Sequence, residues 1–128
     1  MIFKGTEHKR IFTREITRYK ERSIPCNFLA ALFLLTANKN LWRRASRKIN
    51  QFNIDWKFID IRNVGVQEYA LHKLAKDIYL DAGGVTVTNL YEDGFSDQTI
   101  KLIYSAIDIR RHGMALFKTD SKRSENYV

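Results

Sequence analysis

The sequence predicts a mainly α-helical single domain, with about five helices around a central apolar helix at residues 28–37. Three observations favour this class. Apolar residues recur at helical spacing along several segments. Gly and Pro number only 6 and 1 in 128 residues, which favours long regular elements over a turn-rich β architecture. Hydrophobic residues make up 45% of the chain, enough to fill the core of one domain of this length.

The first two helices are expected on either side of a break at Pro25. Helix one should run over about 7–21, with Thr6 as its N-cap and an apolar stripe at helical spacing (His8, Ile11, Phe12, Ile16, Tyr19). Pro25 sits where a helix can begin, and helix two should run from residue 25 or 28 to 37. Helix two is apolar nearly all round, so we expect it to be central.

A turn at residues 38–40 should lead into helix three, at about 41–51, with Asn40 as its cap. Its inner face would carry Leu41, Trp42, Ala45 and Ile49. The loose apolar alternation over 52–61 suits a short strand or an extended crossing. At most a short strand pair is expected, between 54–61 and 85–88.

Two more helices are expected in the second half, at about 66–81 and 97–112. The sequence "AGG" at 82–84 should stop the first of them, before a short helical turn at 89–92. Ser96 should cap the second, and Gly113 should end it. Residues 1–117 then form the domain, and the polar residues 118–128 a disordered tail.

The net charge of +8 is unevenly distributed. Residues 1–62 hold 14 Lys and Arg against 5 Asp and Glu, whereas residues 63–128 hold 8 against 9. The whole positive excess therefore lies in the first half. Such a field attracts nucleic acid, acidic proteins or an anionic surface.

Arginines at every fourth position form a ridge on helix one: Arg10, Arg14, Arg18 and Arg22. Residues four apart are neighbours on a helix surface, and Glu7 and Glu15 can reach Arg10 and Arg18. Arg14 and Arg22 lack an obvious partner within the helix. A solvated face with a few ion pairs is the simpler interpretation for this helix alone.

Helix three favours contact with an anionic partner over a merely solvated face, because no acid lies between Asn40 and Gln51. Its basic residues are Arg43, Arg44, Arg47 and Lys48. Like charges at i,i+4 destabilise a helix, so an anionic partner would relieve the repulsion, as would acids from the C-terminal half. Helix two, the turn and this helix also resemble a helix-turn-helix in outline, although helix two has almost no exposed face for a DNA backbone. Trp42 and Trp56 are expected in the core rather than stacked on bases.

No catalytic, metal-binding or cofactor-binding motif is present. His8 fits the core face of helix one, whereas His72 and His112 are expected at surface or cap positions. Cys26 is expected to be buried and inert. Asp55 and Lys57 match half of the arrangement used by metal-dependent nucleases. Asp60 or Glu68 would have to supply its second acid, and a small nuclease is the least unlikely enzymatic interpretation.

A membrane location is not expected. The apolar run from Ile24 to Ala37 has 14 residues, fewer than the roughly 20 needed to span a bilayer. The mixed-charge helix before it does not suit a signal peptide. Cys26 is the only cysteine, which fits a reducing cytosol.

Four phrases together resemble a family of small uncharacterised proteins from bacteriophages and prophages of Gram-positive bacteria: "GTEHKRIF", "FLAALFLLTANKNLW", "EYALHKLAKDIYL" and "SDQTIKLIYSAIDIRRHG". The resemblance covers about residues 5–113 and brings no catalytic residues. It implies an accessory protein that acts inside the bacterial cell by binding host polymerases, repressors or defence machinery, including CRISPR effectors. The positive charge argues against a DNA-mimic mechanism.

Three functions follow as hypotheses. The first is a non-enzymatic phage accessory protein that binds a host or defence protein or nucleoprotein through the basic face of helices one and three. A CRISPR–Cas inhibitor is one form of it. The alternative is a DNA- or RNA-binding regulatory module that uses helix 41–51. An enzyme, such as a nuclease around Asp55, Lys57 and Asp60, ranks last.

Overall fold

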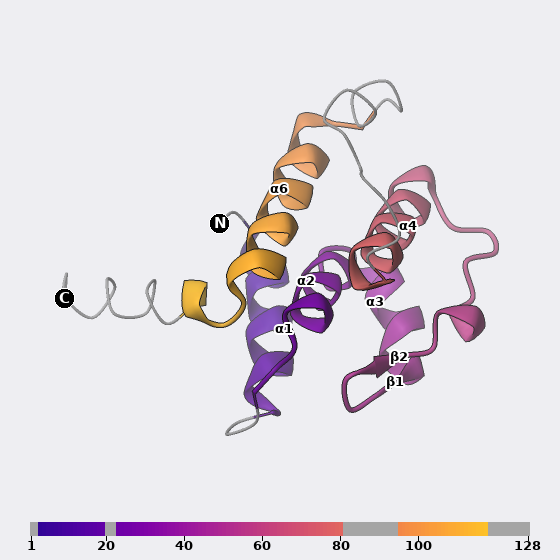
Figure 1. Ribbon diagram of the computed structural model, residues 1–128. Coiled ribbons are helices and arrows are strands. Elements are labelled where there is room, and N and C mark those ends of the chain that lie inside the picture. Colours follow the sequence, from indigo (N-terminus) through magenta and orange to yellow (C-terminus); the bar gives the residue numbers. More distant parts are fainter. Residues whose placement is uncertain (1–2, 20–22, 81–94, 118–128) are drawn as a thin grey trace.

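The computed structural model describes residues 3–19, 23–80 and 95–117, and these are mainly α-helical, as predicted (Figure 1). The longer helices are α1 (Thr6–Thr17), α2 (Cys26–Leu35), α4 (Val66–Leu80) and α6 (Asp97–His112). A short helix, α3 (Lys39–Ala45), follows α2. The 3-10 turns η1 (Ser46–Lys48) and η2 (Trp56–Phe58) flank a small hairpin of β1 (Ile49–Asn50) and β2 (Asn53–Ile54).

Helix α2 is the centre of the fold, which confirms the prediction. Every residue from Phe28 to Leu35 is buried. The helix packs against α1, α3, α4 and α6, and Figure 1 shows it between α1 on one side and α4 on the other. A helix that is apolar on all sides lowers its free energy only when other elements cover every face.

The boundaries of α4 and α6 lie close to those expected. The hydroxyl of Ser96 accepts a hydrogen bond from the backbone N–H of Thr99 at 3.2 Å and caps α6. Gly113 ends that helix at φ 60°, a conformation that favours glycine. The expected stop at 82–84, the turn at 89–92, the strand at 85–88 and the tail at 118–128 lie outside the described residues.

The start of helix three was predicted wrongly. Asn38, not Asn40, is the N-cap of α3: it is extended, and its side chain accepts from the N–H of Leu41 at 3.0 Å. The predicted cap of α1 was also wrong, because Thr6 lies inside that helix and Gly5 precedes it.

Helix α3 also ends earlier than predicted, at Ala45 instead of residue 51. Ile49 pairs with Ile54 across the hairpin, and Gln51 turns the chain at φ 56°. The N–H of Asp55 also donates to the carbonyl of Lys48. Strand pairing needs an extended backbone, so residues 49–51 cannot continue a helix.

The strand expected over 54–61 is reduced to Asn53–Ile54, which pairs with the preceding strand. A 3-10 turn follows at once, and it buries Trp56. Both tryptophans are buried, Trp42 at 9% exposure and Trp56 at 8%, as the apolar pattern predicted.

Two side chains differ from expectation. His72 is buried rather than at the surface, because α4 turns it toward the ring of Trp56, at a centroid distance of 5.6 Å. Cys26 is exposed rather than buried. It is the first residue of α2, and the buried part of that helix begins only at Phe28. His8 is buried and His112 exposed, as expected.

Candidate binding surface

A groove between α1 and α3 brings two of the predicted basic segments together. Its volume is about 570 Å³. The described residues that line it are Glu7, Arg10, Ile11 and Arg14 from α1, and Lys39, Asn40, Trp42 and Arg43 from α3. Both helices pack on α2, so the central helix fixes the spacing between the two basic walls.

The rim of the groove is cationic, and its charges are only partly compensated. Arg10 binds Glu7 through two contacts, Nη2 to Oε1 at 2.6 Å and Nε to Oε2 at 3.1 Å. Arg14 lies 3.9 Å from the Glu15 carboxylate, at the limit of an ion pair. No ion pair joins Arg43 to an acid in the described part of the chain, where its guanidinium instead donates to the Asn40 side-chain oxygen at 2.7 Å.

The floor of the groove is apolar. Ile11 is 4% exposed and Trp42 is 9% exposed, and both belong to the hydrophobic core. The aliphatic stems of the rim arginines continue this apolar lining. The groove therefore combines an apolar base with charged edges, which suits a partner that carries both an apolar side chain and negative charge.

Arg18, the next arginine of the predicted ridge, does not line this groove. Arg18 binds the largely buried carboxylate of Glu15 at 2.9 Å, which confirms the expected pairing. Arg22 and Glu21 lie outside the described residues. The sequence missed Lys39, Asn40 and Glu7 as parts of the surface, although the i,i+3 spacing of Glu7 and Arg10 correctly indicated their contact.

Arg44, one of the predicted contact residues, is directed into the fold. Its side chain is only 23% exposed. Its guanidinium donates to the backbone carbonyls of Asp60 at 2.8 Å and Arg62 at 3.2 Å. Arg44 thus holds the segment after η2 against α3 and does not belong to the candidate surface.

We expect the neighbouring residues Arg43 and Arg44 to separate binding from stability. Arg44→Met should lower the free energy of unfolding by about 1–2 kcal/mol, because two charge-assisted hydrogen bonds are lost. Arg43→Met should change it by less than about 0.5 kcal/mol, because this side chain is exposed. Urea denaturation measures both values. Equal costs for the two variants would contradict this division of roles.

Arg47 and Lys48 lie in η1 and line a second hollow of about 520 Å³ with residues of the hairpin (Ile49, Asn50, Asn53, Ile54, Asp55). Both basic side chains are exposed, and neither forms an ion pair among the described residues. They extend the positive surface from α3 toward the hairpin. Because α3 ends at Ala45, they do not continue the helical face expected over 41–51.

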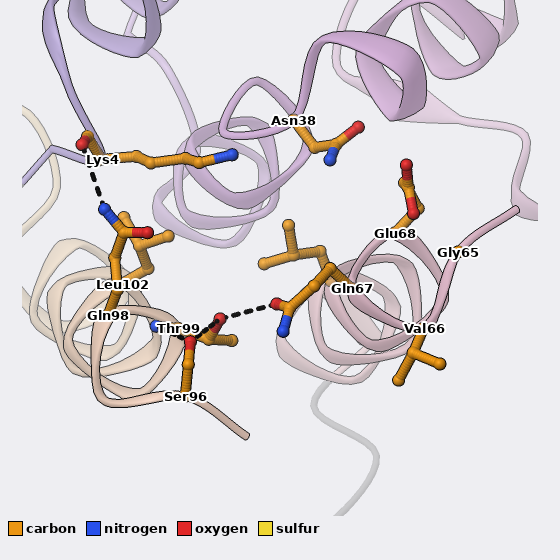
Figure 2. Close-up of a pocket in the computed structure, with 11 residues that line it drawn as sticks. Lys4, Asn38, Gly65, Val66, Gln67, Glu68, Ser96, Gln98, Thr99 and Leu102 are labelled. Atoms are coloured by element: carbon orange, nitrogen blue, oxygen red, sulfur yellow. Dashed lines mark hydrogen bonds between the residues drawn. The ribbon is translucent and has the colours of Figure 1, made fainter. Parts of the chain in front are cut away.

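A third hollow, of about 520 Å³, lies between the N-terminal ends of α4 and α6 (Figure 2). Its polar groups largely satisfy one another. Thr99 donates to the Gln67 side chain at 2.8 Å, and Gln98 donates to the Lys4 carbonyl at 3.3 Å. Figure 2 shows Lys4 and Glu68 on opposite sides of this hollow. The mixed charge gives it no preference for an anion, unlike the groove between α1 and α3.

The acids considered for nuclease chemistry do not form a metal site in the described residues. No group of three or more His, Cys, Asp or Glu side chains there could hold a metal ion. Asp60 accepts from Arg62 at 3.0 and 3.1 Å. Hydrogen bonds from the Arg62 side chain and backbone lower the pKa of Asp60 to about 2. This carboxylate is therefore engaged by Arg62.

Comparisons with protein-family models, curated proteins and solved structures find no match to this chain. The resemblance to phage proteins therefore stays a prediction. Within residues 3–19, 23–80 and 95–117, none of the helices has the length and apolar character that crossing a bilayer requires.

Proposed function

We propose that this chain is a non-enzymatic binding protein whose groove between α1 and α3 contacts an acidic part of a partner protein. One observation carries the proposal. Three arginines and a lysine from two separate segments converge on one groove, and Glu7 is the only acid among the described residues that line it. An excess of charge of one sign in a concave site favours a partner of opposite charge.

The shape of the site favours a protein over a nucleic acid. A duplex presents a convex ridge of phosphates, and proteins read its bases with an element that protrudes into a groove. Here the basic residues edge a hollow, and α3 is a helix of only seven residues that follows a buried helix. An apolar floor also has no role in contacts with phosphates.

The resemblance to phage proteins suggests the setting of this interaction. The partner would be a bacterial host or defence protein, or the protein surface of a nucleoprotein such as a CRISPR effector. This chain would then act inside the bacterial cell by occupying a surface that its partner needs.

Nucleic-acid binding remains the second candidate, and the exposed Arg47 and Lys48 favour it. These side chains continue the positive surface beyond the groove and could contact phosphates without reading bases. The affinity of such an interface falls steeply with salt, because phosphate contacts release counterions.

The proposal is tested by fluorescence anisotropy with three labelled probes: poly-L-glutamate, mixed duplex DNA and structured RNA. The groove variant carries Arg10→Glu, Arg14→Glu and Arg43→Glu. The matched control carries the same charge change at exposed residues of α4 and α6, as Lys73→Glu, Lys101→Glu and Arg111→Glu. Circular dichroism spectra of the wild type and both variants serve to check that each protein is folded.

We expect poly-L-glutamate to bind the wild type at near-physiological salt, and the groove variant to lose at least about tenfold in affinity. Three exposed ion pairs at about 0.2–1 kcal/mol each, together with new repulsion, amount to this factor. The control should lose much less. Equal losses in both variants would overturn the groove as the site. Tighter binding of DNA or RNA than of poly-L-glutamate would favour nucleic-acid binding, the second candidate function.

A further inference from the structure

We propose that Glu7 competes with the partner for Arg10. In the free protein Glu7 occupies the position that a carboxylate of the partner takes on binding, and this partner carboxylate lies beside a large apolar side chain. This inference rests on the proposed function and specifies its ligand. The ligand is an acidic protein segment in which an aliphatic or aromatic residue is flanked by Asp or Glu.

The contact between Glu7 and Arg10 already has the geometry of recognition between separate molecules. Two parallel contacts, at 2.6 and 3.1 Å, join the guanidinium to both carboxylate oxygens. Planar two-point binding of this kind is how arginine recognises a carboxylate. Both side chains are more than half exposed, so a carboxylate from another protein can reach Arg10 without disturbing the core.

The position of Glu7 also marks where the groove favours negative charge. Its hydrogen bond with Arg10 lowers the pKa of the Glu7 carboxyl, and the charges of Arg10, Lys39 and Arg14 lower it further. Lys39 belongs to the opposite wall of the groove. A single carboxylate at this point therefore feels cations from both helices, and an incoming carboxylate would feel the same field.

The floor explains why the ligand should carry an apolar side chain as well. Ile11 and Trp42 form a largely apolar base, and the groove volume of about 570 Å³ lies within the range of ligand pockets. An apolar side chain seated there would place its flanking carboxylates near Arg14 and Arg43. The carboxylate next in line would displace Glu7 from Arg10.

Glu7→Gln tests the competitor, because it removes the negative charge and keeps the side-chain shape. Asp108→Asn is the matched control: it makes the same change at an exposed position of α6. The probes are two fluorescein-labelled peptides, Glu-Glu-Leu-Glu-Glu and Glu-Glu-Ala-Glu-Glu. Affinities are measured by anisotropy at near-physiological salt.

We expect Glu7→Gln to raise the affinity for the leucine peptide about two- to fivefold, the factor expected for freeing one exposed ion pair. Asp108→Asn should leave the affinity within about 1.5-fold of wild type, since its charge lies outside the groove. The leucine peptide should bind wild type at least about tenfold more tightly than the alanine peptide, because it buries more apolar surface.

Two results would overturn the inference alone: Glu7→Gln binds no better than Asp108→Asn, or the two peptides bind equally well. In either case the proposed function stands as long as poly-L-glutamate binding still depends on the groove arginines. If neither peptide nor poly-L-glutamate binds the wild type, the proposed function and the inference both fail.

Discussion

Replacing Phe33 by alanine is expected to lower the free energy of unfolding by about 3–5 kcal/mol. Phe33 is fully buried on the central helix. Its ring centroid lies 4.6 Å from that of His8 and 5.5 Å from those of Phe3 and Phe12. Truncation removes these contacts and leaves a cavity where α1 joins α2. Domains are typically stable by only about 5–15 kcal/mol, so this loss is large.

Phe58→Ala is the control, because the same atoms are removed from a side chain that is 62% exposed. Its expected cost is below about 1 kcal/mol, since little apolar surface is buried there. Urea denaturation of the two variants measures the difference. Similar losses in both would mean that α2 is not the centre of the core.

Acidification from pH 7 to pH 4 is expected to lower the free energy of unfolding by about 3 kcal/mol through His8 alone. Nε2 of His8 donates to the Phe33 carbonyl at 2.8 Å, and Nδ1 accepts from the N–H of Lys4 at 2.9 Å. The neutral ring satisfies both contacts, whereas a protonated ring has no acceptor for Lys4. Burial lowers the pKa of His8 to about 4.

The sign follows from where the proton binds first. An unfolded histidine has a pKa of about 6.5. Between pH 6.5 and 4, His8 is therefore protonated in the unfolded chain and stays largely neutral in the folded chain. Stability is therefore lost as pH falls through this window and is unaffected above it. Burial also lowers the pKa of His72, which adds to the loss in the same direction.

His8→Gln isolates this effect, because an amide can make both hydrogen bonds and does not titrate in this range. Urea denaturation at several pH values between 7 and 4.5 should show a shallower fall for the variant than for the wild type. Should the two proteins lose stability in parallel, His8 would not be the titrating group.

Helices with clear patterns could be predicted closely from the sequence. The stripe and caps of α6 are local signals, and Ser96 and Gly113 act as expected. The all-apolar run of α2 indicated a central position correctly. These predictions succeeded because each depends on side chains within one or two turns of one another.

The region after α3 could not be predicted, because tertiary contacts decide it. The segment "RRASRKIN" contains no Gly or Pro that would break a helix, yet Ile49 pairs with Ile54 and the helix stops. Tyr19, two residues beyond the end of α1, also donates to the carbonyl of Gln51 and holds the hairpin turn. The spacing of residues within the segment does not indicate that Ile54 and Tyr19 are its partners.

The candidate site could be predicted only in part, because tertiary contacts also decide which basic residues share it. Charge density placed it on α1 and α3, but only the packing of both helices on α2 selects Arg10, Arg14 and Arg43 for one groove. Arg43 and Arg44 are identical in type and adjacent in sequence. Their opposite roles depend on the direction of each side chain from a short helix.

The most direct test of the groove is an NMR titration of the ¹⁵N-labelled chain with the Glu-Glu-Leu-Glu-Glu peptide. The chain has two tryptophans, and each indole N–H gives its own signal. Trp42 lies in the floor of the groove, whereas Trp56 packs against His72 and Tyr79. We predict that the Trp42 signal shifts saturably while the Trp56 signal stays in place. A shift of Trp56 with Trp42 unchanged would contradict the assignment of the groove as the binding surface.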